Sequence, residues 1–108
     1  MYTYRAKIIS VYDGDTVTAL VDLGFGITNK IKIRLKGINT PELRGAERPR
    51  GLVSRDFLRE KILDKDIIVE TFRDKKGKYG RYIGTLWLDE ENINELLVEQ
   101  GYAETREY

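Results

Sequence analysis

Polar side chains suited to chemistry gather where an alternating segment runs into a loop, at residues 34–42. The stretch reads Arg34-Leu-Lys-Gly-Ile-Asn-Thr-Pro-Glu42 and supplies a guanidinium (Arg34), an amide (Asn39), a hydroxyl (Thr40) and a carboxylate (Glu42). A loop at the end of a rigid strand is a common position for a functional site. Taken alone, these residues fit a solvated edge strand followed by a turn equally well.

A second cluster is the tetrapeptide Asp13-Gly-Asp-Thr16. Asp-Gly is ordinary hairpin-turn chemistry, because Gly takes a positive φ without penalty, and this accounts for Asp13. Asp15 adds a second carboxylate, and two close carboxylates repel one another unless a cation lies between them. Calcium binds oxygen ligands in flexible geometry, so the pattern predicts a Ca²⁺ ion here.

The third cluster is Lys75-Lys-Gly-Lys-Tyr-Gly-Arg81. It is either a basic hairpin loop exposed to water or a site that offers cations and the ring of Tyr79 to a phosphate and a base. Together, the three clusters supply a metal site, two arginines and a spare carboxylate. That combination suits hydrolysis of a phosphodiester.

The elements that position these clusters follow from the hydrophobic pattern. Strands are predicted over residues 2–12, 16–23 and 28–38, joined by tight turns at Asp13-Gly-Asp15 and Gly24-Phe-Gly26. The third strand alternates apolar and basic residues with a period of two, which is typical of a half-buried strand. Three strands joined by short turns form an antiparallel meander.

A loop and a helix come next. Residues 39–50 are predicted to be loop, because two prolines and a glycine resist regular structure. From Gly51 the period changes to about 3.6, which predicts a helix that ends near residues 63–66. The predicted inner face of this helix consists of Val53, Phe57, Leu58 and Ile62.

The last part of the chain returns to strand and then to helix. Strands are predicted over residues 67–72 and 81–88, followed by a helix capped by Asn92 with Glu95 as its capping-box partner. Gly101 ends this helix, and the tail is either extended or frayed. The predicted inner face of the helix consists of Ile93, Leu96, Leu97 and Gln100.

The order β-β-β-α-β-β-α indicates a mixed β/α (α+β) fold, a five-stranded OB-fold barrel with two packed helices. A split three-stranded sheet with packed helices is the rival architecture. The length of 108 residues fits one domain over residues 1–108. With 41% hydrophobic and 34% charged residues, the composition is typical of a soluble globular protein.

Composition also limits the chemistry. The chain has no His and no Cys, so it lacks the commonest general base, the usual zinc ligands and any disulfide. Catalysis would depend on carboxylates, Arg, Lys, Tyr and a hard metal ion. The net charge of +1 argues against a protein that coats DNA nonspecifically, although basic residues cluster locally at 44–55 and 73–81.

The sequence predicts no association with membranes. No apolar run approaches the roughly 20 residues that span a bilayer, and no signal-peptide region opens the chain. We therefore expect a cytoplasmic monomer, or a secreted protein if a leader has been removed.

Four segments, in this order, resemble the staphylococcal nuclease (thermonuclease) family between about Val11 and Ala103. They are Asp13-Gly-Asp-Thr-Val17, the stretch at residues 34–42, Lys78-Tyr-Gly-Arg81, and Asn94-Glu-Leu-Leu-Val-Glu-Gln-Gly-Tyr-Ala103. The resemblance implies an OB-fold barrel with packed helices. It also implies a calcium-dependent nuclease that acts on single-stranded or melted DNA and on RNA, cleaving the 5′-oxygen–phosphorus bond to leave 3′-phosphates.

The resemblance further implies a metal site. Asp15 matches the family's metal-ligand aspartate, with Asp13 close to it, and Thr40 would lend its backbone carbonyl to the ion. Asn39 stands where the family prototype has a second ligand aspartate. An Asn oxygen coordinates calcium without bringing negative charge, and fewer ligand charges give weaker binding.

The same resemblance assigns the phosphate-binding residues. Arg34 and Arg81 match the two arginines that hold the scissile phosphate, and Glu42 matches the glutamate that orients or activates the attacking water. Lys78 and Tyr79 match residues that hold a terminal phosphate of the bound strand. The prototype's third helix has no counterpart, which indicates a compact family member.

Two other function classes stay open. The first is an OB-fold module that binds nucleic acid without cutting it, as do repeats of this family that have lost their catalytic residues. The second is a plain protein-interaction domain. The matching residues at Asp15, Arg34, Glu42 and Arg81 favour the nuclease, because a binding module has no need of them.

Overall fold

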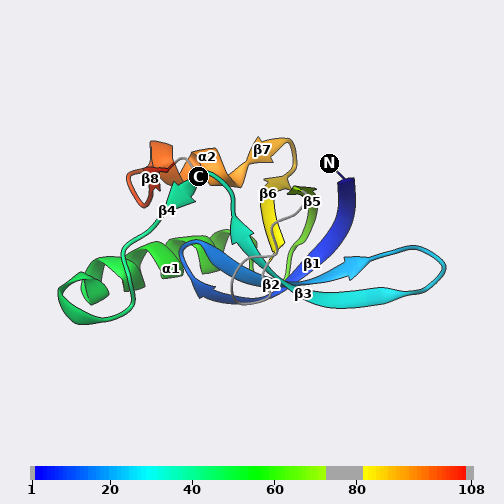
Figure 1. The fold of residues 1–108 in the computed structure, drawn as a ribbon, viewed down its shortest axis with the longest axis horizontal. Helices are drawn as coiled ribbons and strands as arrows, with labels where there is room; N and C mark the ends of the chain where they lie inside the picture. Colours follow the sequence, from blue (N-terminus) through cyan, green and yellow to red (C-terminus); the bar gives the residue numbers. More distant parts are fainter. Residues whose placement is uncertain (1, 73–81, 107–108) are drawn as a thin grey trace.

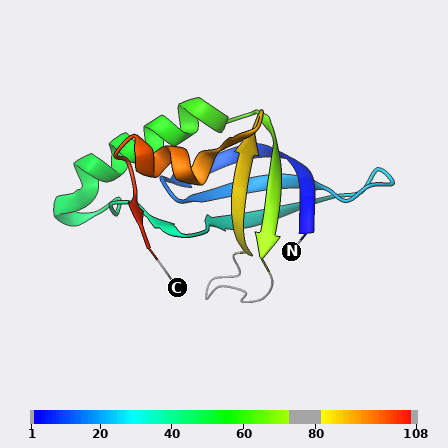
Figure 2. The same ribbon diagram turned by 90° about the horizontal axis from the view of Figure 1, so that it is seen from above.

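Five strands close into a barrel in the computed structural model, which describes residues 2–72 and 82–106 (Figures 1 and 2). They are β1 (Tyr2–Asp13), β2 (Thr16–Asp22), β3 (Thr28–Leu35), β5 (Asp66–Phe72) and β6 (Tyr82–Leu88). The order β3-β2-β1-β5-β6 is antiparallel throughout, and a parallel pairing of β3 with β6 closes it. This closure confirms the OB-fold prediction, and the split-sheet alternative is wrong.

Shorter elements fill the connections. They are β4 (Ile38–Asn39), a 3₁₀ helix η1 (Gly45–Glu47), β7 (Glu91–Asn92) and β8 (Glu104–Thr105), with helices α1 (Arg48–Ile62) and α2 (Ile93–Glu99). β7 pairs antiparallel with the end of β6, and β4 pairs with β8. Within the described ranges, neither helix has the length and apolar character needed to cross a bilayer.

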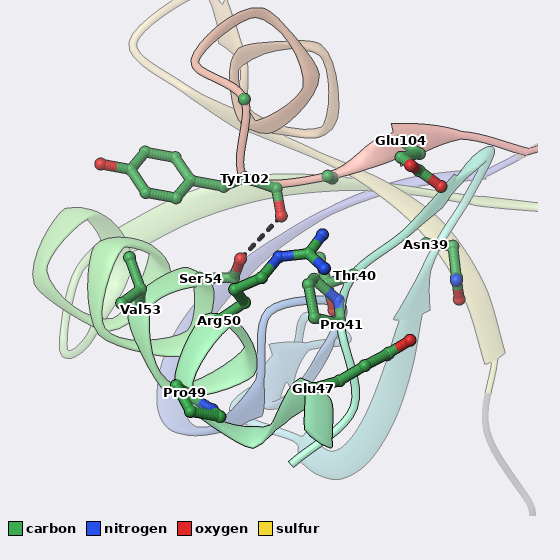
Figure 3. Close-up of a pocket in the computed structure, with 12 residues that line it drawn as sticks. Asn39, Thr40, Pro41, Glu47, Pro49, Arg50, Val53, Ser54, Tyr102 and Glu104 are labelled. Carbon is green, nitrogen blue, oxygen red and sulfur yellow. Dashed lines mark hydrogen bonds between the residues drawn. The ribbon is translucent and has the colours of Figure 1, made fainter. Parts of the chain in front are cut away.

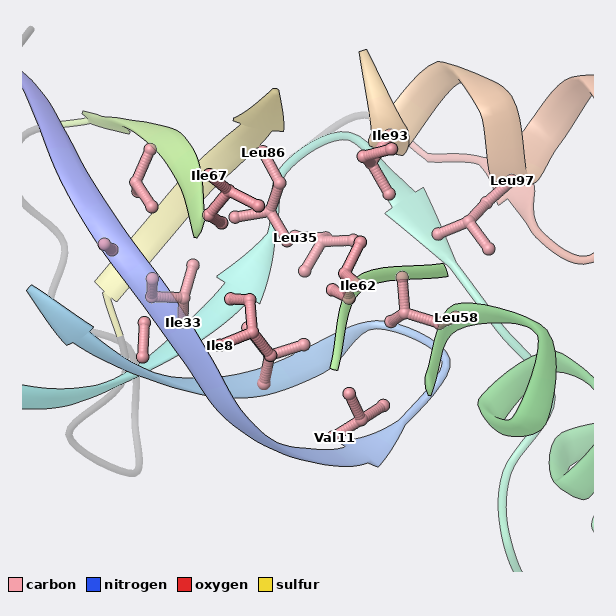
Figure 4. Packing of buried hydrophobic residues seen from close by; sticks show 14 of the residues in the cluster. Ile8, Val11, Ile33, Leu35, Leu58, Ile62, Ile67, Leu86, Ile93 and Leu97 are labelled. Atoms are coloured by element: carbon pink, nitrogen blue, oxygen red, sulfur yellow. The ribbon is translucent and has the colours of Figure 1, made fainter. Parts of the chain in front are cut away.

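The core lies inside the barrel and beneath the two helices. Inward-facing side chains of the strands meet Leu58 and Ile62 of α1 and Ile93 and Leu97 of α2 (Figure 4). All four helical side chains are fully buried. Burying an aliphatic side chain of this size contributes about 1.5–3 kcal/mol, so both helices are held by the barrel rather than by their own propensity.

The first helix differs from its prediction in two respects. It begins at Arg48 rather than Gly51, because Pro49 in a first turn has no N–H to leave unsatisfied and already has a helical φ. Its buried face consists of Gly51, Ser54, Leu58 and Ile62, whereas Val53 is 55% exposed. The prediction of Val53 as a core residue is wrong, because the apolar pattern does not count Gly and Ser as contact positions.

The third strand is also shorter than predicted. β3 ends at Leu35, and a turn with Gly37 at φ +79° separates it from β4. The predicted extended tail is present in part as β8, and Arg106 N–H donates to the Gly37 carbonyl at 2.8 Å. Gln100 is exposed beyond the end of α2, so its assignment to the inner face is wrong.

Two asparagines attach α2 to the barrel. Asn92 caps the helix as predicted, with its Oδ1 accepting from Glu95 N–H at 3.0 Å. Buried Asn94 accepts from Leu86 N–H at 3.1 Å, and its amide donates to the carbonyls of Lys36 and Gly84. These bonds join α2 to β6 and to the turn after β3, where the first polar cluster begins.

Candidate active site

The β1–β2 turn brings the aspartates to the end of the barrel. Asp13 pairs with Thr16 across the turn, and Asp15 N–H donates to Asp13 Oδ1 at 3.0 Å. Gly14 does not adopt a positive φ. Its role is steric, because a Cβ there would lie 2.8 Å from Thr40 Cγ2 and 2.9 Å from Ser54 Cβ. Glycine therefore lets the turn approach the segment that carries Thr40.

Asp15 is the centre of a buried hydrogen-bond cluster and is only 6% exposed. Its Oδ2 accepts from the N–H and from the hydroxyl of Thr40, both at 3.0 Å, and lies 3.4 Å from Arg34 Nη1. Its Oδ1 accepts from the Thr16 hydroxyl at 3.2 Å. A buried carboxylate requires such partners, and these bonds fix its orientation.

Arg34 lies at the end of β3, with a side chain that is 14% exposed. Nη1 donates to the Leu35 carbonyl at 3.1 Å, and Nη2 lies 3.4 Å from Asn39 Oδ1. Together with Asp15, these contacts hold the planar guanidinium between the β1–β2 turn, β3 and β4. The structure therefore brings together Arg34, Asn39, Thr40 and the two aspartates, which come from two separate segments of the sequence.

The two aspartates affect one another. Burial, followed by a side-chain hydrogen bond with Asp15 and by the negative charge of Asp15, raises the pKa of Asp13 to about 6. The Asp15 N–H and the Arg34 charge act in the opposite direction. A cation bound beside such an acid pair lowers the repulsion between the two carboxylates, because it favours the ionised form of both.

The oxygen donors of the site fit a hard cation. Asp13 and Asp15 offer carboxylates and Asn39 an amide oxygen, the ligand types that calcium prefers over thiolate or imidazole. The ligand charge is low, since no three His, Cys, Asp or Glu side chains within residues 2–72 and 82–106 come together as a metal-binding group. Thr40 contacts Asp15 through its N–H and hydroxyl, so the role of its carbonyl stays a prediction.

Glu42 lies apart from this buried cluster, on the exposed β4–η1 connection. Its carboxylate pairs with Arg44 at 3.1 Å, and its N–H donates to Glu47 Oε1 at 2.9 Å. The loop backbone packs on α1 at Gly51, where a Cβ would collide with the Glu42 carbonyl oxygen and lie 2.8 Å from that of Pro41. Gly51 is therefore a positioning residue that the sequence pattern did not reveal.

A pocket of about 520 Å³ lies beside Asn39 and Thr40 (Figure 3). The first turns of α1 form one wall, and residues 101–104 form the other. Ser54 Oγ joins the walls by donating to the Tyr102 carbonyl at 2.7 Å. The sequence did not predict this pocket, because one wall comes from a tail whose path depends on the β4–β8 pairing.

Three predicted phosphate-binding residues, Lys78, Tyr79 and Arg81, lie outside the described residues. Their assignments stay predictions. The described chain resumes at Tyr82, where β6 pairs with Ile33 of β3 and thus runs beside the strand that carries Arg34.

The chain is similar in sequence to several known proteins. The model of the family described as staphylococcal nuclease homologue matches residues 32–108. The thermonuclease of Staphylococcus hyicus is 31% identical over 105 residues, covering 94% of this chain and 59% of that protein. An uncharacterized endonuclease of Haemophilus influenzae is 33% identical over 98 residues, covering 90% and 49% respectively.

A plant relative is also similar. Ribonuclease TUDOR 2 of Arabidopsis thaliana is 28% identical over 105 residues, which cover 94% of this chain and 11% of that protein. The chain thus spans less than two thirds of the length of each of these relatives. The family model nevertheless matches well over half of the chain, and the chain belongs to the family of staphylococcal nuclease homologues.

Proposed function

We propose that the chain is a calcium-dependent nuclease that hydrolyses single-stranded or melted DNA and RNA to 3′-phosphate products. The observation that carries the proposal is the arginine fixed beside buried Asp15 and half-buried Asp13, with Arg34 Nη1 3.4 Å from Asp15 Oδ2. Two carboxylates repel a polyanion, so they disfavour simple binding of nucleic acid unless a cation joins them. The nuclease names of several relatives support the same reading.

Arg34 would act on the scissile phosphate. Its guanidinium donates hydrogen bonds to the non-bridging oxygens, whose charge increases in the pentacovalent transition state. Asp15 and Asn39 hold the group before substrate arrives, so little reorganisation is needed during the reaction. Arg81 is proposed as a second donor.

A divalent ion and a base complete the proposal. Calcium held by Asp15, Asn39 and the Thr40 carbonyl, with Asp13 close by, would supply Lewis-acid polarisation of the phosphate. Glu42 would orient a water and accept its proton for in-line attack on phosphorus. Because Glu42 pairs with Arg44, that ion pair has to open before the carboxylate reaches a water.

The test uses the full chain and denatured DNA, with calcium or with a chelator. We expect calcium-dependent shortening of the DNA and products that accept a 3′ label only after phosphatase treatment. Arg34→Ala should lower the rate about a hundredfold, the usual loss for a transition-state donor worth about 3 kcal/mol. Arg55→Ala is the matched control, since Arg55 pairs with Asp56 on the surface of α1.

A noncatalytic nucleic-acid-binding module is the second candidate. The observation that favours it is Asn39, which adds no charge to the metal site and already lies 3.4 Å from Arg34 Nη2. Retention of DNA without cleavage at any calcium concentration would support the module and contradict the nuclease. An Arg34→Ala chain that digests DNA at the parent rate would contradict the role assigned to Arg34.

A further inference from the structure

The outer face of β3 carries a row of cations that leads away from the candidate active site. The alternation buries Ile33 and Leu35 in the core and places Lys30, Lys32 and Arg34 on the opposite face. Residues two apart on a strand are separated by about 6.6 Å. This step is on the order of one nucleotide in an extended single strand.

The two lysines are not neutralised by their surroundings. Both are exposed, and within the described ranges neither forms an ion pair. Their partners on β2 are uncharged, since Thr18 pairs with Lys32 and Leu20 with Lys30. Lys36, by contrast, sits 3.8 Å above the ring of Phe72. The positive potential of Lys30 and Lys32 is thus available to an anion.

The row has a defined far end. Beyond Lys30 the outer face opens into a groove of about 870 Å³ between the β2–β3 hairpin and the turn after β6. Two cations, Arg5 and Lys7, line this groove. Four carboxylates line it as well, those of Asp22, Asp66, Asp89 and Glu90. This excess of negative charge repels phosphates, so a polyanion that follows β3 is favoured only as far as Lys30.

We propose that β3 is a backbone track, on which Lys32 and Lys30 bind the two phosphates next to the one held by Arg34. The occupant is an extended single strand of DNA or RNA, so the proposal rests on the proposed function. A duplex is too stiff to follow one β-strand of a small barrel. Phosphate contacts carry no sequence information, and the neighbouring side chains of Leu20 and Thr18 contribute surface shape rather than specific contacts to bases. Binding is therefore independent of sequence.

The test is equilibrium binding of fluorescein-labelled oligothymidylates in chelator, where calcium-dependent cleavage does not occur. A dinucleotide and an octanucleotide are compared over a range of salt concentrations. Each phosphate contact on a single strand contributes about 0.7 to the slope of log affinity against log salt. The double variant Lys30→Gln/Lys32→Gln should therefore lower the slope for the octanucleotide by about 1.4. It should also remove most of the difference in affinity between the octanucleotide and the dinucleotide.

Two matched variants sharpen the result. Lys61→Gln/Lys65→Gln removes the same charge from the end of α1 and the turn after it, and it should leave the slope unchanged. Lys30→Arg/Lys32→Arg keeps the charge and should keep the slope. Thermal unfolding of each variant should be close to that of the parent, because these side chains are outside the core and the surface ion pair of Lys61 with Glu91 contributes only about 0–1 kcal/mol.

Several outcomes would overturn the track. The first is an unchanged salt slope in Lys30→Gln/Lys32→Gln. The second is an equal decrease of the slope in Lys61→Gln/Lys65→Gln. The third is a duplex of the same length whose affinity falls as much as that of the single strand when Lys30 and Lys32 are replaced. Lysines on a strand edge also discourage pairing with other chains. If this were the only role of Lys30 and Lys32, replacing them would leave the salt slope of nucleic-acid binding unchanged. Because the assay is independent of cleavage, a chain that binds through these lysines but never cuts supports the track and contradicts the nuclease.

Discussion

The candidate site has two halves that are built in different ways. Asp15 is 6% exposed, and its carboxylate is held by Thr40, which lies 25 positions further along the chain. The Glu42 side chain is 64% exposed, and its partner Arg44 is two positions away. The half that would hold the phosphate is thus buried and cross-linked, while the half that would activate water lies on a surface loop.

The difference shows where the fold fixes chemistry. The register of β2 against β3 places Asp15 beside Arg34, and the hydrogen bonds of Thr40 and Asn39 attach β4 to them, so this half is fixed as long as the barrel is closed. The loop that carries Glu42 is placed by its backbone contact with Gly51 of α1. Changes in the buried half should therefore cost stability, and changes in the loop should affect activity with less effect on folding.

The largest expected effect is that of Asp15→Ala on stability. The variant leaves Thr40 N–H, the Thr40 hydroxyl and Arg34 without their shared acceptor. Removing one partner of a buried pair costs about 3–5 kcal/mol, and we expect about 3 kcal/mol because Arg34 reaches water in part. The measurement is the free energy of unfolding from urea titration.

Glu42→Ala is the matched control for this comparison. Exposed ion pairs contribute about 0–1 kcal/mol, so its stability should lie within about 0.5 kcal/mol of the parent. Equal losses in the two variants would mean that the two halves are not built differently.

The next effect in size is that of Gly51→Ala. The new methyl group collides with the Glu42 carbonyl oxygen, and backbone atoms on both sides have little room to move. Such overpacking lowers the free energy of unfolding by about 1–3 kcal/mol. The displaced loop should raise the activation free energy of cleavage by at least the same amount. Val53→Ala on the same helix is the control, since Val53 is 55% exposed. A Gly51→Ala chain with parent activity would show that the loop is not placed by α1.

The sequence predicted the buried half better than the loop. Period-two alternation in β2 and β3 identifies which side chains face the core, and the turn residues then bring Asp15 and Arg34 to neighbouring strand ends. Both facts are local, so a single sequence is enough. In β1 a bulge after Ile8 interrupts the alternation, so the next buried residue is Val11. Closure through the parallel β3–β6 pairing depends on contacts between distant segments, and only the β-β-β-α-β-β-α order indicated it.

What the sequence missed depends on small residues and on remote pairing. Gly51 and Ser54 lie on the buried face of α1, and because neither is hydrophobic, the apolar pattern does not identify them as contact positions. The wall of the pocket near Tyr102 exists because β8 pairs with β4, a two-residue match too short to recognise in advance. The assignments of Lys78, Tyr79 and Arg81 stay predictions.

A smaller effect tests the metal side of the buried half. Asn39→Asp adds a third carboxylate near Asp13 and Asp15, and calcium affinity rises with the charge of its ligands. We expect roughly tenfold tighter binding, which corresponds to about 1.4 kcal/mol, measured by calorimetric titration with calcium. Asn29→Asp is the control, since Asn29 lies on β3 away from this cluster. Unchanged affinity in Asn39→Asp would remove Asn39 from the ligand set.

The smallest expected effect concerns Arg44, the partner of the exposed half. Its side chain is 87% exposed and the pair with Glu42 is on the surface, so Arg44→Ala should change stability by less than about 0.5 kcal/mol. The rate on denatured DNA should stay within about twofold of the parent, because the pair has to open for Glu42 to reach a water. Urea titration and initial cleavage rates measure both quantities. A rate loss of the size expected for Arg34→Ala would mean that Arg44 holds Glu42 in place, and that the exposed half is as preorganised as the buried one.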